Sequence, residues 1–535
     1  MLYVVLPLPI FLFGWLEIWA AVPLALCAGY SLKPLAASLP AESWPVSGTH
    51  LAVAAAVGCA WTACGGTGHL VFANTDWHLR DAVLHDLVTG RWPVGYGVGA
   101  DRLLRAPIGY YLPAALIGKG AGLIAAHAAL AAWTAAGVVL FLLQVLSPTA
   151  PQPAGTSGAA RAGGRLVSSR VCVRGLVGAL GAAAVIVLFS GLDVIGTWLQ
   201  APGSLAHWDV TRHLEWWAES YQYSSMTTQL FWVPNHALGG WLLIGLLMRE
   251  PGVPERPGAG REPRDSGLEA RRGGLDTVLP LVLVALALWS PLTALGAAPF
   301  VLCRMGDSVR RDRSLALADP RIWAPALAVG LVLAAYLTLD AGRIPRGWTI
   351  GRHGLGAGAV TRDLWRHAEF FLLEAGLIGA AILAIRASSR VVLALAILAL
   401  LPLVSFGAAN DFVMRVSIPS LAVLAIAACR ALAQGAPSAP ARIKRGVLAG
   451  LLVLGAVTPL QEFARAAVLE RWPINLDATL VGAACGSYPP HYVADLHGQW
   501  LTQVLRPPHA LPLGPLDAAA CANPALRIEK SRGLR

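Results

Sequence analysis

Charged side chains are scarce in this 535-residue chain, and that scarcity excludes most classes of soluble protein. Asp, Glu, Lys and Arg make up 13% of the residues, whereas a soluble globular protein has about 25%. Hydrophobic side chains make up 56%. So little charge cannot cover a water-soluble fold of this length. A soluble enzyme, a nucleic-acid-binding factor and a small secreted disulfide domain are therefore excluded.

Other common features are missing as well. The eight cysteines show no metal-ligand spacing, and no glycine-rich nucleotide-binding loop is present. No internal repeat of useful length appears, which weakens an interpretation as an inverted-repeat transporter. No basic segment precedes the first apolar run, which begins at Leu2, so we expect no cleavable signal peptide. The function must therefore be sought in the polar segments between apolar runs.

The apolar runs predict an all-α, polytopic transmembrane helical bundle of about 11–13 spans, because each run can cross about 30 Å of hydrocarbon. A stretch over 278–304 is too long for one span and too short for two, so we expect a short hairpin broken at Trp289-Ser290-Pro291. The other spans are expected near 3–31, 51–73, 121–146, 175–199, 229–248, 322–341, 368–386, 391–407, 415–433 and 446–461.

Arginine supplies most of the positive charge and indicates the orientation. The 41 Lys and Arg residues against 30 Asp and Glu give a net charge of +11. Under the positive-inside rule this excess marks cytoplasmic loops rather than nucleic-acid binding, and we place the linkers 147–174, 249–276 and 435–445 there. The Arg-rich, Lys-poor, Ala- and Gly-heavy composition is typical of a high-GC bacterium. We therefore expect a multi-pass protein of the bacterial inner (cytoplasmic) membrane.

With this orientation, four unusual segments fall on the non-cytoplasmic face. They are the loops 74–106, 200–228, 342–367 and 408–414 of a transmembrane domain over 1–461. Residues 462–535 follow as a small non-cytoplasmic C-terminal tail, in which Cys485 and Cys521 could pair in an oxidising compartment. This convergence on one face is where we expect an active site.

The first of these loops opens with Asn74-Thr75-Asp76, immediately after the apolar residues 71–73. A carboxylate at the mouth of a span is desolvated enough to accept a proton from a hydroxyl group. The helix expected over 76–89 has an apolar face and an opposite face of His78, Asp81 and His85, which is typical of an amphipathic helix at the membrane surface. The simpler interpretations are a helix cap for Asp76 and a surface strut for the helix.

The region around loop 200–228 is rich in tryptophan, with six of the nineteen between Trp198 and Trp241. Aromatic rings beside carboxylates and guanidinium groups suit a sugar or isoprenoid-phosphate pocket, because the rings stack on apolar C–H faces. An interfacial aromatic belt is the simpler alternative. The aromatic candidates are Trp208, Trp216, Trp217 and Tyr221, and Asp209 lies among them.

Two further loops carry arginine. Arg352 and His353 in loop 342–367 suit a phosphate leaving group, unless this run is only a solvated basic face or the topology is different. Asp411 precedes Arg415 between two spans, where a tight turn capped by Asp411 is the simpler explanation. The acids expected within spans are isolated in sequence, which argues against a proton relay; they are Glu17, Asp193 and Glu374.

The sequence around Asp76 resembles the GT-C superfamily, polytopic glycosyltransferases that use polyprenyl-phosphate-linked sugars. The resemblance covers residues 70–125. It rests on an acidic residue straight after a span, in Asp76-Trp77-His78-Leu79-Arg80, and on the later runs Leu84-His85-Asp86-Leu87, Trp92-Pro93 and Pro107-Ile108-Gly109-Tyr110-Tyr111-Leu112-Pro113.

The resemblance implies an inverting transfer of a sugar from a polyprenyl-phosphate donor to a glycan, lipid or protein hydroxyl on the outer face, with Asp76 as general base. Many members carry an acidic pair here, so the second acid is Asp81 or Asp209, or is absent, and a requirement for a divalent metal (Mg²⁺ or Mn²⁺) stays open. The leaving phosphate would be bound by Arg80, Arg352, His353 or Arg415. Contacts to sugar or lipid would come from Trp77, His78, Trp208, Trp216, Trp217 and Tyr221.

Other functions stay open beside this one. An enzyme of the O-antigen ligase or polymerase type would have its catalytic centre in loop 342–367, and Asp76 would be dispensable. A transporter or lipid flippase needs a continuous polar path through the spans, for which three isolated acids give little support. A structural scaffold leaves the outward clustering of Trp, Arg, His and Asp unexplained.

Overall fold

The chain is mostly helical, as the apolar runs predict. The computed structural model describes residues 1–38, 46–146, 175–205, 209–219, 221–249, 276–312, 320–407 and 409–522. Most of the linkers 147–174 and 249–276, Trp208 and the end of the C-terminal tail lie outside these residues. Five helices are long and apolar enough to cross a membrane: Leu123–Leu146, Pro320–Thr338, Ala357–Ile385, Asp411–Ala433 and Ala439–Val468.

These five helices bear the labels α7 (Leu123–Leu146), α15 (Pro320–Thr338), α16 with α17 (Ala357–Phe371 and Leu377–Ile385), α19 with α20 (Asp411–Val416 and Ile418–Ala433), and α21 with α22 (Ala439–Gly455 and Val457–Val468). The other helices are shorter or less apolar: α1 Leu2–Val5, α2 Pro7–Trp15, α3 Ile18–Ser38, α4 Gly48–Ala63, α5 Asp76–Thr89, α6 Leu112–Ala121, α8 Gly175–Val187, α9 Asp193–Gln200, α10 Met226–Trp232, α11 Pro234–Met248, α13 Leu279–Trp289, α14 Pro291–Asp312, α18 Ser389–Leu400, α23 Leu480–Ala483 and α24 Ala518–Ala522. Membrane passage by the shorter helices stays a prediction.

The centre of the molecule is built on α7 and α11. Helix α7 packs against α4, α6 and α11, while α20 packs against α11 and α18. Large aromatic side chains fill the space between them, and the indoles of Trp61 and Trp241 stack with their centroids 5.6 Å apart. The polar atoms of these rings are satisfied inside the core, since Trp61 donates to Thr227 and Trp241 donates to Gln229.

The first apolar run is broken, whereas the sequence suggested one span over 3–31. Helix α2 ends at Trp15, and Leu16 has an extended backbone that bridges to Leu505 in the C-terminal segment. The Glu17 amide donates to the carbonyl of Val504. Backbone pairing with a distant segment therefore takes the place of continued helix at this point.

Residues 278–304 form the helical hairpin expected from the break at Trp289-Ser290-Pro291. Helices α13 and α14 pack side by side on either side of Ser290, which has an extended backbone. The guanidinium of Arg304 in α14 lies 3.0 Å from the carboxylate of Asp276, just before α13. The two arms of the hairpin are therefore joined away from the break at Ser290.

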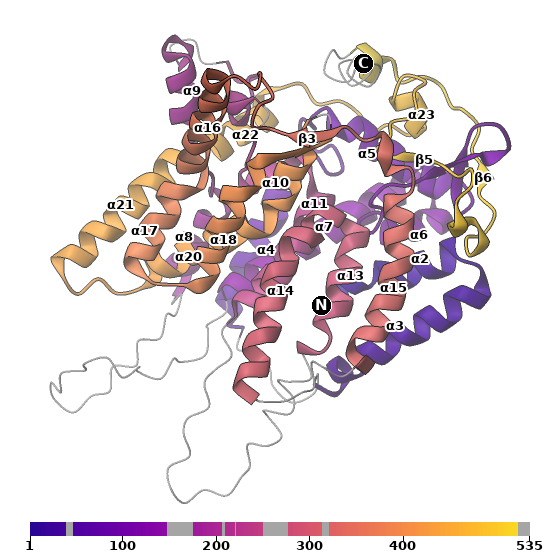
Figure 1. Cartoon of the computed structure of the whole chain (residues 1–535), viewed down its shortest axis with the longest axis horizontal. Helices are drawn as coiled ribbons and strands as arrows, with labels where there is room; N and C mark the ends of the chain where they lie inside the picture. The colour runs from indigo at the N-terminus through magenta and orange to yellow at the C-terminus, as the bar shows by residue number, and fades with distance from the viewer. Residues whose placement is uncertain are drawn as a thin grey trace, which may run out of the picture.

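The loops that sequence analysis placed on one face gather along one side of the molecule, the upper side in Figure 1. Helices α5, α9, α16 and α22 lie there with two small sheets. The first sheet has the order β5-β2-β1-β6, formed by Val493–Asp495, Arg102–Leu104, Val94–Tyr96 and His509–Ala510. The second pairs β3 (Arg346–Trp348) with β4 (Val404–Phe406).

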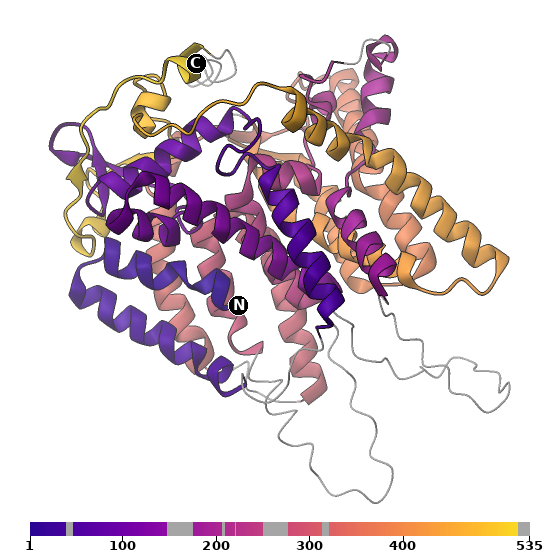
Figure 2. The ribbon, with the colours of Figure 1, turned by 180° about the vertical axis from the view of Figure 1, so that it is seen from behind.

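The C-terminal segment is part of this side rather than a separate unit. The boundary suggested after residue 461 falls inside α22, and the chain beyond it supplies two of the four strands of the first sheet. Figure 2 shows this segment running across the top of the bundle from α22 toward α23. Segments distant in the sequence therefore build the outer side together.

Candidate functional site

The start of α5 is held rigidly against the end of α10. The Asn74 side chain accepts a hydrogen bond from the Asp76 amide at 3.1 Å and donates to the carbonyl of Phe231 at 2.7 Å. The Trp77 indole donates to the same carbonyl at 3.0 Å. Gly66 has φ of +79°, and a Cβ there would lie 2.9 Å from the Trp77 ring nitrogen, so the turn before α5 requires glycine. These contacts fix the position of Asp76.

Asp76 is the half-exposed member of an ion pair whose other member is buried. The Asp76 carboxylate lies 2.9 Å from the Arg80 guanidinium one turn along α5, and the side chains are 37% and 3% exposed. Arg80 also donates to the Asn235 side chain at 2.6 Å and hydrogen-bonds to Tyr111. A carboxylate in the first helical turn is further favoured by the helix dipole. The result is an accessible carboxylate beside a fixed positive charge.

Arg415 belongs to the same neighbourhood. The Thr293 hydroxyl contacts the carbonyls of His236 and Arg415 at 3.1 and 3.3 Å, which ties the beginning of α11 to α19. The charges of Arg80 and Arg415 both act on the His236 imidazole. Arg415 itself is paired with Asp411 at 3.0 Å. Asp76 with Arg80 and Asp411 with Arg415 form two separate ion pairs, and the charges of both guanidinium groups reach the same imidazole.

Sequence reasoning gave no role to Asn235, which accepts a hydrogen bond from Arg80, or to His236, whose carbonyl contacts the Thr293 hydroxyl. The signal that could have found them is the run Pro234-Asn235-His236, which places two polar side chains at the start of an apolar span. Proline at the first helical position sets the start of α11 there, so both side chains lie at its N-terminal end.

Helix α5 is not an amphipathic helix exposed at the membrane surface, contrary to the expectation. Its side chains from Trp77 to Leu84 are buried all round. The polar face meets the C-terminal segment instead: His78 lies 3.0 Å from Asp517, and the Asn475 amide donates to Asp81 at 3.3 Å. The C-terminal segment covers the face that the pattern assigned to water.

This burial changes the interpretation of two aromatic candidates. Trp77 is 0% exposed and Trp217 donates its indole hydrogen to Glu374 at 2.9 Å from a buried position. Both rings therefore serve the core and present no surface to a sugar. His78 is also buried, stacked on Trp472 with ring centroids 4.1 Å apart. Trp216, in contrast, is exposed.

No acidic pair forms at Asp76 among the residues that the structure describes. Asp81 is buried and lies 2.9 Å from His69 and 3.9 Å from His127. Asp209 is exposed and accepts hydrogen bonds from the amide and hydroxyl of Thr211 at 2.8 and 2.7 Å, which lowers the pKa of its carboxyl group. Each of the two candidate second acids is therefore engaged elsewhere.

The described residues also contain no group of three or more His, Cys, Asp or Glu side chains arranged to hold a metal ion. The donor set that Mg²⁺ or Mn²⁺ would need, several oxygen ligands around one point, does not fit the surroundings of Asp76.

Loop 342–367 forms a second polar cluster on the same side. His353 lies 2.8 Å from Asp363, which also accepts a hydrogen bond from the Gly351 amide. The charges of Arg352 and Arg366 act on the Tyr221 hydroxyl, so this loop meets loop 200–228. The paired strands β3 and β4 connect it to the segment that leads into α19. No hydrogen bond or ion pair among the described residues joins His353 to Asp76.

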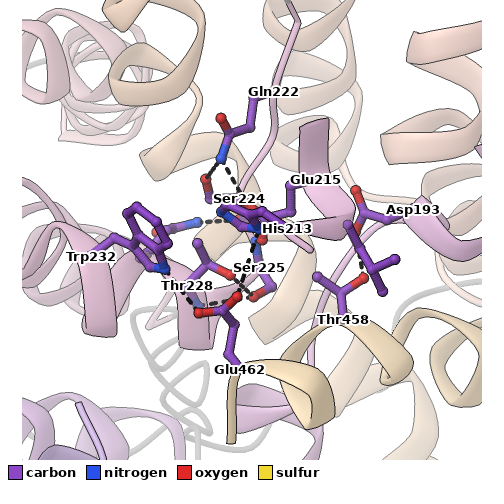
Figure 3. Close-up of polar contacts among 12 residues, drawn as sticks. Asp193, His213, Glu215, Gln222, Ser224, Ser225, Thr228, Trp232, Thr458 and Glu462 are labelled. Atoms are coloured by element: carbon purple, nitrogen blue, oxygen red, sulfur yellow. Dashed lines mark hydrogen bonds and ion pairs between the residues drawn. The ribbon is translucent and has the colours of Figure 1, made fainter. Parts of the chain in front are cut away.

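A buried polar network connects loop 200–228 to α22. Figure 3 shows His213 of the loop between Glu215 and Glu462. The imidazole is 4.0 Å from Glu215 and 3.6 Å from Glu462. Burial, aided by the Asp193 charge, raises the pKa of Glu215 to about 8. Burial, aided by the Arg465 charge, lowers the pKa of His213 to about 3. Near neutral pH both side chains are therefore uncharged.

The acids that looked isolated in the sequence belong to this same region. Asp193 accepts hydrogen bonds from Ser190 at 2.9 Å and Thr458 at 2.8 Å, and its carboxyl group faces that of Glu374. Helix packing brings together residues that are far apart in sequence, so the expectation of isolated acids was wrong for Asp193 and Glu374. Glu17 lies elsewhere, at the break after α2.

Cys485 and Cys521 are joined by a disulfide, with their Cα atoms 5.5 Å apart. The bridge closes a loop that carries β5, β6 and Asp517. Because Asp517 contacts His78, this disulfide belongs to the segment that covers α5.

Comparison with known proteins identifies no relative of this chain. No protein-family model matches the chain, and neither a curated protein nor a solved structure does.

Proposed function

We propose that this chain is a membrane glycosyltransferase that moves a sugar from a polyprenyl-phosphate donor to an acceptor hydroxyl. We place it in a bacterial inner membrane as a multi-pass protein whose active side is the outer one. The observation that carries the proposal is the Asp76 carboxylate, which is accessible yet held beside the buried positive charge of Arg80. A base and a phosphate-binding charge at one point are what this transfer requires.

In this proposal Asp76 takes the proton of the acceptor hydroxyl as its oxygen bonds to the anomeric carbon. The bond from that carbon to the phosphate oxygen breaks at the same time, and its electron pair leaves with the polyprenyl phosphate. Attack from the face opposite the leaving group inverts the anomeric configuration. The contacts from Asn74 and Trp77 support this role, since a general base must be held within hydrogen-bond reach of the proton it removes.

The leaving phosphate gains negative charge as the bond breaks, and fixed positive charge stabilises it. Arg415, on α19, is a candidate for this because its charge acts on the His236 imidazole together with that of Arg80. The hydrogen bonds of Arg80 to Asn235 and Tyr111 hold its guanidinium before the donor binds. A charge that needs no rearrangement stabilises the transition state more than a mobile one.

The substitution Asp76→Asn tests this assignment, because it keeps an acceptor for Arg80 and removes the base. We expect kcat for sugar transfer to fall by roughly 10²–10⁴-fold. The assay would use protein in lipid nanodiscs, a panel of undecaprenyl- and decaprenyl-phosphate sugars, and cell-envelope extract as acceptor, with release of polyprenyl phosphate measured by mass spectrometry. Asp477→Asn, at an exposed carboxylate, is the matched control. An unchanged rate in Asp76→Asn refutes the role of the base.

A ligase or polymerase type of enzyme is the second candidate, favoured by the cluster of Arg352, His353 and Tyr221 on the same side. Such an enzyme would use loop 342–367 for the sugar phosphate. In the same assay, His353→Ala would then abolish transfer and Asp76→Asn would leave it intact. The two candidates therefore predict opposite results for one pair of variants.

A further inference from the structure

Three arginine side chains line a pocket at the far end of α11 from Asp76, and we call it the arginine pocket. It lies where α11, α17 and α20 end and α18 begins, and α20 packs against the other three helices (Figure 1). It encloses about 370 Å³ of empty space, counting its open mouth. The polar residues that line it are Arg386, Ser388, Arg390 and Arg430, and the rest of its lining is apolar.

Helix α11 separates this pocket from the candidate catalytic site. Near its start, Asn235 accepts the hydrogen bond of Arg80, and at its end Met248 lines the arginine pocket. The helix between these two residues spans about 20 Å. The pocket is therefore a separate site, on the side that carries the linkers 249–276 and 435–445, which we place in the cytoplasm.

The carbonyl of Met248 holds two of the guanidinium groups at the pocket. Arg430 donates to this oxygen at 2.7 Å and Arg390 donates to it at 3.5 Å. The oxygen belongs to the last residue of α11, where the negative end of the helix dipole favours cations. Side chains that are ordered before a ligand arrives lose less entropy when it binds.

The chemistry of the pocket suits a phosphate group. Planar guanidinium groups form paired hydrogen bonds with phosphate oxygens, and three of them line this one pocket with the Ser388 hydroxyl. Helix α18 begins at the same point, and the positive end of its dipole favours an anion there. The three arginines are half-buried, so a bound phosphate would be partly withdrawn from water.

The surface beside the pocket is apolar, which indicates where the phosphate comes from. Val392, in the same first turn of α18 as Arg390, is exposed. Helix α21 is tied to the end of α20 by the hydrogen bond of Arg445 to the Leu432 carbonyl, and its side chains Ile443 and Val447 are exposed. In a membrane protein such side chains contact acyl chains, so this basic pocket lies at the level of lipid headgroups.

We propose that the arginine pocket binds the phosphate of an anionic glycerophospholipid from the leaflet on that side of the membrane. Arg386, Arg390 and Arg430 bind the phosphate oxygens, and the acyl chains lie along the apolar surfaces of α18 and α21. The bound headgroup joins the ends of α11, α17 and α20 to the start of α18. Lipid binding at this site therefore stabilises the bundle, whatever reaction takes place at Asp76.

Thermal unfolding of the full chain in detergent tests this proposal. Phosphatidylglycerol, phosphatidylcholine or inorganic phosphate would be titrated, because only the first combines acyl chains with a net negative phosphate. We expect a saturable rise in Tm with phosphatidylglycerol alone. Arg386→Gln should raise the apparent Kd for phosphatidylglycerol about 10-fold. Arg442→Gln is the matched control, since it removes the same charge from an exposed position on α21.

The proposal is overturned if inorganic phosphate raises the Tm as phosphatidylglycerol does, because the ligand would then be a free phosphate. Equal effects of phosphatidylglycerol and phosphatidylcholine, or equal losses in Arg386→Gln and Arg442→Gln, would also overturn it. Native mass spectrometry gives a measurement that needs no variant. The native protein, supplied with equal amounts of both lipids, should retain phosphatidylglycerol in preference, and equal retention would contradict a phosphate site of this kind.

Discussion

The substitution Glu215→Gln should change how stability depends on pH above pH 4.5. Burial raises the pKa of Glu215 to about 8 from its ordinary value of 4.5, so the folded protein holds a proton there that the unfolded chain has released. Stability contributed by the protonated carboxyl group is complete below pH 4.5 and is lost as pH rises toward 8. Glutamine keeps an oxygen for the Ser225 amide and cannot ionise.

His213 has the opposite effect at acid pH. Burial lowers the pKa of its imidazole to about 3 from 6.5, so stability is lost as pH falls from 6.5 toward 3. Between pH 4.5 and 6.5 the contributions of Glu215 and His213 to the unfolding free energy change with pH by equal and opposite amounts. Their sum therefore does not change with pH in this range. Above pH 6.5, of these two groups only Glu215 still changes the stability, at roughly 1 kcal/mol or a little more per pH unit.

From pH 6.5 to 8 the native protein should lose about 2 kcal/mol of unfolding free energy through Glu215. The Glu215→Gln variant should not show this loss. Thermal unfolding in detergent, followed at intervals from pH 5.5 to 8.5, gives the Tm of each protein. The difference between the variant and the native protein should grow in favour of the variant over this interval. Glu219→Gln, at an exposed carboxylate, should show no such trend. Parallel Tm curves for Glu215→Gln and the native protein would refute the assignment of a buried, protonated Glu215.

Two further predictions concern the covering of α5. Asp81→Ala leaves His69 and the Asn475 amide without their buried partner, so the unfolding free energy should fall by about 2–4 kcal/mol, measured as a lowered Tm, whereas the exposed Asp477→Ala should keep the native Tm. Cys485→Ser opens a loop of 36 residues and should loosen the C-terminal segment, seen as faster proteolysis after α22. A reductant should speed proteolysis of the native protein to the rate of the Cys485→Ser variant and leave the rate of the variant unchanged. If the two proteins are cleaved at the same rate without reductant, the prediction is wrong.

The helical class and the position of Asp76 could be predicted from the sequence because both depend on local pattern. Most of the long apolar runs are helical for reasons of local pattern, and a carboxylate that follows such a run closely lies near its end. The hairpin break at Ser290 follows equally from a local feature, the proline at 291 that cannot donate to the helix before it. The polar environment of Asp76 follows in the same way from the position of Arg80, one turn along the helix.

The environment of α5 and the buried acids could not be predicted, because each depends on segments hundreds of residues away. The face with His78 and Asp81 has the spacing of a solvated surface, yet Asn475 and Asp517 satisfy its polar groups from the C-terminal segment. A helical periodicity reports which side chains share a face and carries no information about what covers that face. Glu374 is likewise placed against Asp193 by packing of helices whose separation in the chain hides the pair.

The C-terminal segment is, on this argument, part of the candidate site. Asp517 and Asn475 hold the polar face of α5, the disulfide closes the loop that carries Asp517, and α22 supplies Glu462 to the buried network around His213. Asp76 begins α5, so any movement of that segment acts on the same helix that carries the carboxylate and Arg80. If the proposed function is correct, the position of the base depends on the segment after residue 461, because that segment packs against the helix that begins with Asp76.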